Sequence, residues 1–133
     1  MAFEANPPSG KPILMDAYPD AGGHGLGPTP LETMLSGLAA CSAMDVISIL
    51  QKKRQKVTGY RVEVEGVRPE PGVYPRPFTQ ITVRHIVEGD NLDDAAVAQA
   101  VKLSDEKYCS VIATFRANPE IRSVYEIRSA QPV

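Results

Sequence analysis

The sequence predicts one mixed α+β domain, and three observations favour this fold class. A strong helix-start signal precedes a long run of apolar residues at helical spacing, and two later segments alternate apolar with polar residues. A second helical run then ends at a cysteine. The 133 residues fit a single domain spanning 1–133, since the chain carries no internal repeat and no shift in composition that would mark a boundary.

The first 30 residues are rich in glycine and proline, and they hold one plausible short strand at residues 12–16. A loop with the sequence AGGHGLGPTP follows this strand. It lacks the Gly-Lys-Ser/Thr ending of a phosphate-binding loop, so we expect no such site there. His24, inside this segment, is most simply a loop residue.

A long helix is predicted to begin after Thr29. Thr29 suits the N-cap, Pro30 suits the first helical position, and Glu32 lies where its side chain closes a capping box. Apolar residues then recur at helical spacing, which predicts about 26 helical residues, or nearly 40 Å at 1.5 Å per residue. Small residues surround Cys41 and permit close approach of another helix. We expect a central spine of this kind to be shared with a second subunit.

Two strands are predicted at residues 57–67 and 78–88, because apolar and polar residues alternate in both. The segment RPEPGVYPRP joins them and reads as a long hairpin loop, since proline is excluded from strand interiors. His85 falls on the apolar face of the second strand. At such a position a hydrogen-bonded imidazole in a core or interface is more common than a ligand or a base.

A second helix is predicted to begin near Asn91, where Asp93 and Asp94 suit the positive end of a helix. Cys109 lies at or just past its final turn. The following residues, 110–127, predict two strands joined at Asn118-Pro119, which would complete the α+β domain.

Composition gives no reason to expect a nucleic-acid partner. The chain is 43% hydrophobic and 23% charged, with a formal net charge of −2, as in ordinary globular proteins. The N-terminus lacks a basic region followed by an apolar stretch, and no segment approaches 18 uninterrupted apolar residues. We therefore expect a cytoplasmic protein without a membrane partner.

Two cysteines, Cys41 and Cys109, stand 109 − 41 = 68 residues apart. In a reducing compartment such a pair more often serves catalysis, redox sensing or metal binding than a static cross-link. A disulfide requires α-carbons about 4.4–6.8 Å apart. If the fold brings the pair together, a sulfenic acid at Cys41 can condense with Cys109, and an external thiol can then restore both.

Other interpretations of the cysteines stay open. Cys41 also fits a structural thiol, because its helical neighbours offer no cation and a charged Asp45 disfavours the reactive thiolate. A zinc site from both cysteines with His24 and His85 fits by residue type. No two of these residues form a short chelating pair, so we expect no metal and no cofactor.

Three segments carry a family resemblance: GPTPLETMLSGLAACSAMDVISILQKKRQKVTGYRVEVEG, then AVKLSDEKYCSVIATF, then IRSVYEI. With these segments the chain resembles the OsmC/Ohr family of osmotically induced and organic-hydroperoxide-resistance proteins. The likeness covers roughly residues 27–127. Two separated cysteine segments in the right order are far more specific than one short motif.

The resemblance implies an OsmC-like α+β fold in which antiparallel sheets wrap two long central helices of an intertwined homodimer. It also implies a cysteine-based peroxidase for organic hydroperoxides. Cys41 would be the peroxidatic thiol and Cys109 the resolving thiol. An external dithiol, such as a lipoylated protein, would be the reductant, and no cofactor is implied.

The chain departs from the family pattern at two positions. Strong peroxidases of the family pair an arginine of an N-terminal strand with a glutamate ten residues before the first cysteine. Glu32 is nine residues before Cys41, and no arginine precedes Arg54. We keep Glu32 as a candidate catalytic residue but favour its capping role.

The missing arginine leaves the thiolate without its expected stabiliser. Four basic residues are candidates to replace it: Lys11, Arg84, Lys107 and Arg116. The same absence supports an alternative function, a noncatalytic or weakly reactive dimeric small-molecule-binding protein of the same fold.

Overall fold

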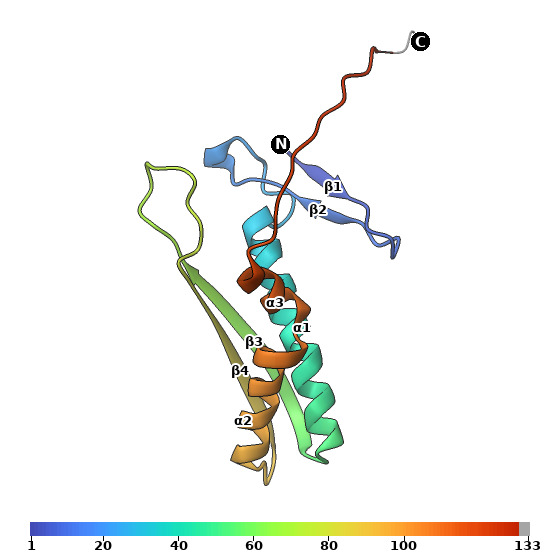
Figure 1. Cartoon of the computed structure of the whole chain (residues 1–133), viewed down its shortest axis with the longest axis vertical. Coiled ribbons are helices and arrows are strands. Elements are labelled where there is room, and N and C mark those ends of the chain that lie inside the picture. Colours follow the sequence, from blue (N-terminus) through green and yellow to red (C-terminus); the bar gives the residue numbers. More distant parts are fainter. Residues whose placement is uncertain (131–133) are drawn as a thin grey trace.

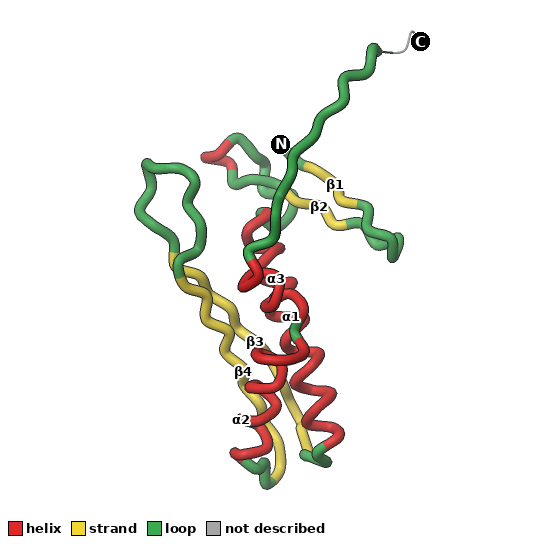
Figure 2. The backbone as a smooth tube through the Cα atoms, viewed as in Figure 1, coloured by secondary structure: helices red, strands yellow, loops and turns green. Residues whose placement is uncertain are grey.

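A long helix, α1 (Pro30–Lys52), lies along a β-hairpin in the computed structural model of this protein, which describes residues 1–130 (Figures 1 and 2). The hairpin consists of β3 (Lys56–Val67) and β4 (Gln80–Asp90), and α2 (Asp94–Leu103) packs beside α1. A π-helical turn, η2 (Ser104–Tyr108), and a short helix, α3 (Ser110–Ala117), follow. The predicted mixture of helices and antiparallel strands is confirmed.

Helix α1 begins as predicted and ends earlier than predicted. The N–H of Glu32 donates to Oγ1 of Thr29 at 3.2 Å, and Oε1 of Glu32 accepts the N–H of Thr29 at 3.0 Å, which completes the capping box. The helix has 23 residues because Arg54 adopts a left-handed backbone with φ of 56° and turns the chain into β3.

Strands β3 and β4 pair antiparallel along almost their whole length, with Val64 opposite Val83 and Val62 opposite His85. Both predicted strands are therefore confirmed to within two residues. The proline-rich segment between them forms the long loop that the sequence predicts. One face of this hairpin packs against α1, so His85 points toward the helix that carries Cys41.

The core consists of two clusters along α1. Val46 and Leu50 are fully buried with Ala100 of α2 near the end of the helix. Leu38 is buried with Cys109 and with Ile112 of α3 farther up. Cys109 is therefore part of the core, and α3 fixes its position against α1.

The N-terminal segment forms a separate two-stranded sheet of β1 (Phe3–Ala5) and β2 (Ile13–Met15), followed by the 3₁₀ turn η1 (Pro19–Ala21). The sequence predicts β2 but not β1. The buried carboxylate of Asp16 accepts the N–H groups of Ala17, His24 and Leu26, and these bonds hold the glycine-rich loop. The bonds from Leu26 and His24 lower the pKa of Asp16.

The prediction of two strands at residues 110–127 is wrong. Ser110–Ala117 is helix α3, and residues 118–130 contain no helix or strand. Cys109 caps α3 and Asn118, with φ of 52°, ends it. The β-branched and aromatic residues Val111, Ile112 and Phe115 favour a strand by composition, whereas their spacing of i, i+1 and i+4 fits one face of a helix. The remaining tail extends away from the other elements (Figure 1).

Among the described residues, α1 alone is long and apolar enough to span a membrane by length and composition, with a mean hydropathy of 1.6 in its most apolar window. Core helices pass the same test, so this is weak evidence for a span. The helix buries one polar side chain, Ser42, and still exposes apolar ones, such as Met44. An exposed apolar surface of this kind bears on assembly.

Candidate active site around Cys41 and Cys109

The fold brings the two cysteines together. Cys41 lies in the middle of α1, whereas Cys109 lies between η2 and α3. The sulfur of Cys41, the sulfur of Cys109 and a carboxylate oxygen of Asp45 all lie within 4.8 Å of one another. Both thiols are free. Two thiols that lie 68 residues apart in the sequence thus form one cluster with the carboxylate of Asp45.

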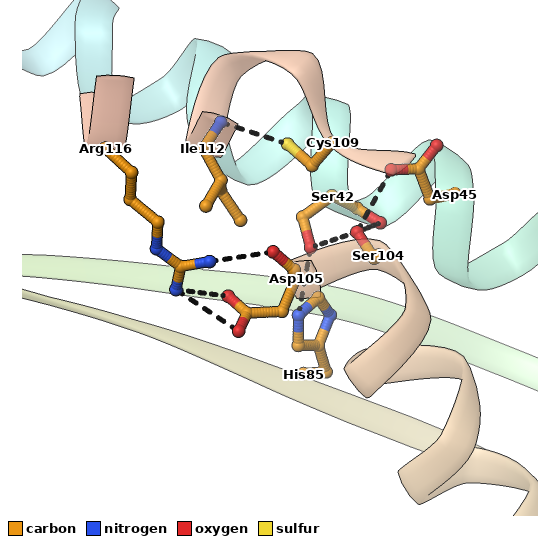
Figure 3. A network of polar contacts seen from close by, with 8 residues as sticks. All are labelled: Ser42, Asp45, His85, Ser104, Asp105, Cys109, Ile112 and Arg116. Atoms are coloured by element: carbon orange, nitrogen blue, oxygen red, sulfur yellow. Dashed lines mark hydrogen bonds and ion pairs between the residues drawn. The ribbon is translucent and has the colours of Figure 1, made fainter. Parts of the chain in front are cut away.

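The π-helical turn η2 directs Cys109 toward α1. The N–H of Cys109 donates to the carbonyl oxygen of Ser104, five residues earlier, at 2.9 Å. The chain then becomes extended at Cys109 and α3 begins, with the N–H of Ile112 donating to the Cys109 sulfur at 3.5 Å. Figure 3 shows this sulfur on the side of the turn that faces α1. π-helical turns occur frequently at functional sites.

The two thiols differ in their surroundings. Cys41 is half-buried, whereas Cys109 is only 3% exposed. Burial raises the pKa of the Cys109 thiol above its ordinary value, and the neighbouring Cys41 adds to this shift. The N–H of Ile112 acts in the opposite direction. Cys109 therefore needs a proton acceptor before it can react as a thiolate.

Asp45 lies one helical turn after Cys41, on the same side of α1. Its Oδ2 accepts a 3.0 Å hydrogen bond from the hydroxyl of Ser104, which is completely buried. Asp45 is the site residue that sequence reasoning missed. The sequence shows that Asp45 follows Cys41 by four residues, but only the fold shows that Cys109 and Ser104 converge on the same carboxylate.

A hydrogen-bonded network continues from Ser104 into the hairpin (Figure 3). Ser104 Oγ lies 3.1 Å from Ser42 Oγ, which lies 3.3 Å from Nε2 of His85. The Tyr60 hydroxyl lies 2.6 Å from Nδ1 of the same ring. Burial lowers the pKa of His85 and raises the pKa of Tyr60 to about 12. His85 is thus the hydrogen-bonded, half-buried imidazole that its position in the strand predicts.

Two basic residues near the site, Arg116 and Lys107, already have partners. Arg116 of α3 forms an ion pair with Asp105 at 3.1 Å and also donates to the Asp105 carbonyl oxygen. Lys107 lies over the ring of Tyr108, 5.2 Å from its centroid. Across residues 1–130, no lysine or arginine donates a hydrogen bond to either sulfur.

Glu32 stands apart from the sulfur cluster. Its exposed carboxylate closes the capping box, and the N–H of Thr29 is the main cause of its lowered pKa. Nine residues of helix correspond to roughly 13 Å along the axis between Glu32 and Cys41. Glu32 instead lines a separate cavity of about 510 Å³ together with Tyr18 and Arg68.

Two cavities adjoin the network. One of about 570 Å³ is lined by Ser42, His85 and Lys102 together with apolar side chains of β4 and α2. A second of about 330 Å³ reaches Cys109 between η2 and α3. The zinc site considered from the sequence is not formed among the described residues, since neither His24 nor His85 belongs to the cysteine cluster.

Comparisons with known proteins agree with this architecture. The OsmC-like protein family matches residues 23–124. Protein YhfA of Escherichia coli K12 is 44% identical over 130 residues, which cover 98% of this chain and 92% of YhfA. A solved structure of a hypothetical protein from Aquifex aeolicus VF5 is 34% identical with a TM-score of 0.72, covering 87% of this chain and 79% of that one.

A more distant structure shares the fold. The organic hydroperoxide resistance protein OsmC of Legionella pneumophila superposes with a TM-score of 0.61 over 89% of both chains, at 14% identity. This similarity identifies an OsmC-like α+β fold in the present chain.

Proposed function

Because this chain belongs to the OsmC-like protein family, we propose that it is a thiol-dependent peroxidase that reduces organic hydroperoxides through Cys41 and Cys109. One observation carries the proposal: the two sulfurs lie within 4.8 Å of each other although they come from distant segments. The fold shared with an organic hydroperoxide resistance protein supports the substrate class.

The reaction begins at Cys41. Its thiolate attacks the terminal oxygen of the hydroperoxide, the O–O bond breaks, and the alkoxide takes a proton and leaves as an alcohol. Cys41 is oxidised by two electrons to a sulfenic acid. Cys109 then attacks the Cys41 sulfur, the sulfenic oxygen leaves as water, and a disulfide forms. An external dithiol, of the lipoyl type, reduces this disulfide and is itself oxidised.

The unequal burial of the thiols supports this division of roles. The half-buried Cys41 is accessible to a peroxide, whereas Cys109 is buried and its pKa is raised. A thiol of that kind reacts slowly with an external oxidant but rapidly with a neighbouring sulfenic acid, because proximity replaces a bimolecular encounter. Disulfide formation requires the sulfurs to approach to about 2.05 Å.

We further propose that the protein acts as an intertwined homodimer. The tail after α3 exposes its large apolar side chains almost completely: Ile121 is 85%, Val124 93%, Tyr125 89% and Ile127 87% exposed. Met44 on α1 is 70% exposed. A second copy that receives the tail as an added strand and packs on α1 would cover these surfaces. We further propose a cytoplasmic role in defence against oxidative stress.

The alternative is a noncatalytic or weakly reactive small-molecule-binding dimer. One observation favours it: within the described part of the chain, no lysine or arginine donates a hydrogen bond to either sulfur. A thiolate without such a partner is less stabilised. The cavity beside Ser42 and His85 would then be the binding site.

Peroxide consumption separates the two candidates. Reduced protein is mixed with cumene hydroperoxide and excess dihydrolipoamide, and the remaining hydroperoxide is measured over time. We expect multiple turnovers for the native protein and none for Cys41→Ser. Consumption no faster than that of the Cys41→Ser, Cys109→Ser double variant would reject the peroxidase and favour the binding protein.

A matched control excludes general effects of substitution. Glu70→Gln removes one exposed carboxylate in the loop between β3 and β4, outside the cluster and outside the cavity that reaches Cys109. This variant should consume hydroperoxide at the native rate. A loss of activity in Glu70→Gln would show that the assay responds to surface charge rather than to the thiols.

A further inference from the structure

Disulfide formation by Cys109 leaves one proton without an assigned acceptor. The Cys109 thiol is buried and protonated in the resting state, because burial raises its pKa. It must lose its proton when it attacks Cys41. The only carboxylate in the cluster of described residues around the two sulfurs is Asp45, with an oxygen within 4.8 Å of both.

The network behind Asp45 fixes this carboxylate. Ser104 is 0% exposed and Ser42 is 2% exposed, so bulk water does not compete for their hydroxyl groups. An ionised carboxylate only accepts hydrogen bonds, so the single hydroxyl proton of Ser104 is donated to Oδ2 of Asp45 at 3.0 Å. Figure 3 shows this contact beside the turn that carries Cys109.

The other hydrogen bonds of the network agree with this direction of the Ser104 hydroxyl. Since Ser104 donates to Asp45, it accepts from the hydroxyl of Ser42 at 3.1 Å. Ser42 in turn accepts from Nε2–H of His85 at 3.3 Å, and Nδ1 accepts from the hydroxyl of Tyr60 at 2.6 Å. Every donor in this assignment points toward Asp45. A carboxylate oxygen has several lone pairs, so Asp45 keeps the capacity to accept a thiol proton.

We infer that Asp45 is the proton acceptor for Cys109 during disulfide formation, and that Ser104 is the positioning residue that holds its carboxylate beside the sulfurs. This inference rests on the exchange step of the proposed function but not on peroxide as the oxidant. General bases are recognised by such proximity, and their hydrogen bonds often shorten only when the reaction proceeds.

The step conserves protons and electrons whether Cys41 carries a sulfenic acid or a mixed disulfide. As the Cys109 sulfur attacks, its proton moves to Asp45, the new S–S bond forms, and the bond from Cys41 sulfur to its leaving group breaks. With a sulfenic acid, Asp45 returns the proton to the departing oxygen, which leaves as water. With a mixed disulfide, a thiolate leaves, and Asp45 releases the proton to solvent.

Four other titratable groups face the network from the elements packed around it. On η2, Asp105 is paired with Arg116 of α3 at 3.1 Å. On β3, Tyr60 stays protonated because its pKa is raised to about 12. On β4, the pKa of His85 is lowered, so this ring is neutral above neutral pH. Lys102 lines the cavity beside His85. A change of rate above neutral pH therefore reports on the Cys109 thiol, whose pKa is raised by burial.

The test uses an oxidant other than peroxide. Reduced full-length protein in EDTA is treated with one equivalent of the aromatic disulfide dithiobis(nitrobenzoate). This reagent forms a mixed disulfide at the accessible Cys41 and releases one thionitrobenzoate. Attack by Cys109 releases a second thionitrobenzoate, which stopped-flow absorbance follows. The thionitrobenzoate leaves as an anion and needs no proton, so this second release isolates the loss of the Cys109 proton.

Asp45→Asn keeps the shape and the acceptor for Ser104 but removes the base. Near neutral pH we expect the second release to slow about 100-fold, the size of a typical general-base contribution. The deficit should shrink as rising pH ionises the Cys109 thiol directly. The first release should not slow. A second release at the native rate across the whole pH range would overturn the inference.

Controls make the result specific. Cys109→Ser must abolish the second release, and Glu70→Gln, at an exposed carboxylate in the loop between β3 and β4, must leave it unchanged. Ser104→Ala should slow it severalfold while Ser104→Thr, which retains the hydroxyl, restores it. If Asp45→Asn does not fold, as judged by circular dichroism, native rates in Ser104→Ala overturn the inference. A protein that consumes no hydroperoxide but shows this pattern would reject only the peroxidase.

Discussion

Asp45 and Ser104 form a 3.0 Å hydrogen bond that joins α1 to η2 where the chain turns toward Cys109. Ser104 acts twice at this junction, because its carbonyl oxygen also accepts the N–H of Cys109 at 2.9 Å. The same residue thus positions the carboxylate and the Cys109 thiol. The distance between the two sulfurs therefore depends on a polar contact in the core as well as on apolar packing.

Replacement of Cys109 by serine should stop the proposed cycle after one oxidation. Without the resolving thiol, the sulfenic acid at Cys41 cannot form an internal disulfide and persists. Dimedone labelling with mass spectrometry should detect one adduct at Cys41 in Cys109→Ser after a single equivalent of cumene hydroperoxide. The native protein should show a disulfide and little adduct. Labelling of Cys109 in a Cys41→Ser variant would contradict the assigned roles.

Glu32 offers a test that separates capping from catalysis. Glutamine can replace glutamate in a capping box, so Glu32→Gln should keep both the fold and hydroperoxide turnover. Thr29→Ala removes the N-cap oxygen and should lower the free energy of unfolding by about 1 kcal/mol, also without changing turnover. Urea denaturation and the hydroperoxide assay measure the two effects. Turnover lost in Glu32→Gln would instead support a catalytic carboxylate.

Local signals in the sequence predicted much of the fold. The capping box at Thr29 and the alternation in β3 and β4 are local patterns with a direct structural cause. The start of α1 forms as predicted, and both strands form to within two residues of the prediction. The prediction for the segment after Cys109 failed because its β-branched and aromatic residues favour a strand, whereas their spacing fits a helix. The cap that decides between them is the Cys109 sulfur, which accepts the N–H of Ile112.

The site could be predicted only in part. The pair Cys41 and Cys109 stood out because the chain has no other cysteine. Asp45 was visible only as a neighbour of Cys41, since its contact with Ser104 joins residues 59 apart in sequence. The link from Ser42 to His85 likewise spans 43 residues. Such contacts follow from how the hairpin and helices pack, which no local pattern encodes.

Asp16 should make the N-terminal loop sensitive to acid. Its pKa is lowered in the folded protein by the N–H groups of Leu26 and His24. The resulting stability is therefore present above the ordinary aspartate pKa of about 3.9 and is lost as the pH falls toward the lower folded value. Asp16→Asn should be less stable than the native protein at neutral pH, and the difference should narrow in acid.

Thermal unfolding of both proteins across this pH range checks the prediction. Asp20→Asn, at an exposed acidic position in η1, is the matched control and should leave stability unchanged at every pH. Equal stability of Asp16→Asn and the native protein at neutral pH would show that the three N–H bonds do not depend on the charge.

The tail beyond α3 should decide the assembly state. Its apolar side chains from Ile121 to Ile127 are 85% or more exposed at four positions, so a single chain does not bury them. Truncation after Asn118 removes all four, whereas truncation after Arg128 keeps them and is the matched control. Sedimentation velocity over a range of concentrations should detect a dimer for the native protein and for the shorter deletion. Truncation after Asn118 should shift the equilibrium to monomer, because the area buried by the tail is lost. A concentration-independent dimer after that truncation would show that α1 and the sheets alone hold the two copies together.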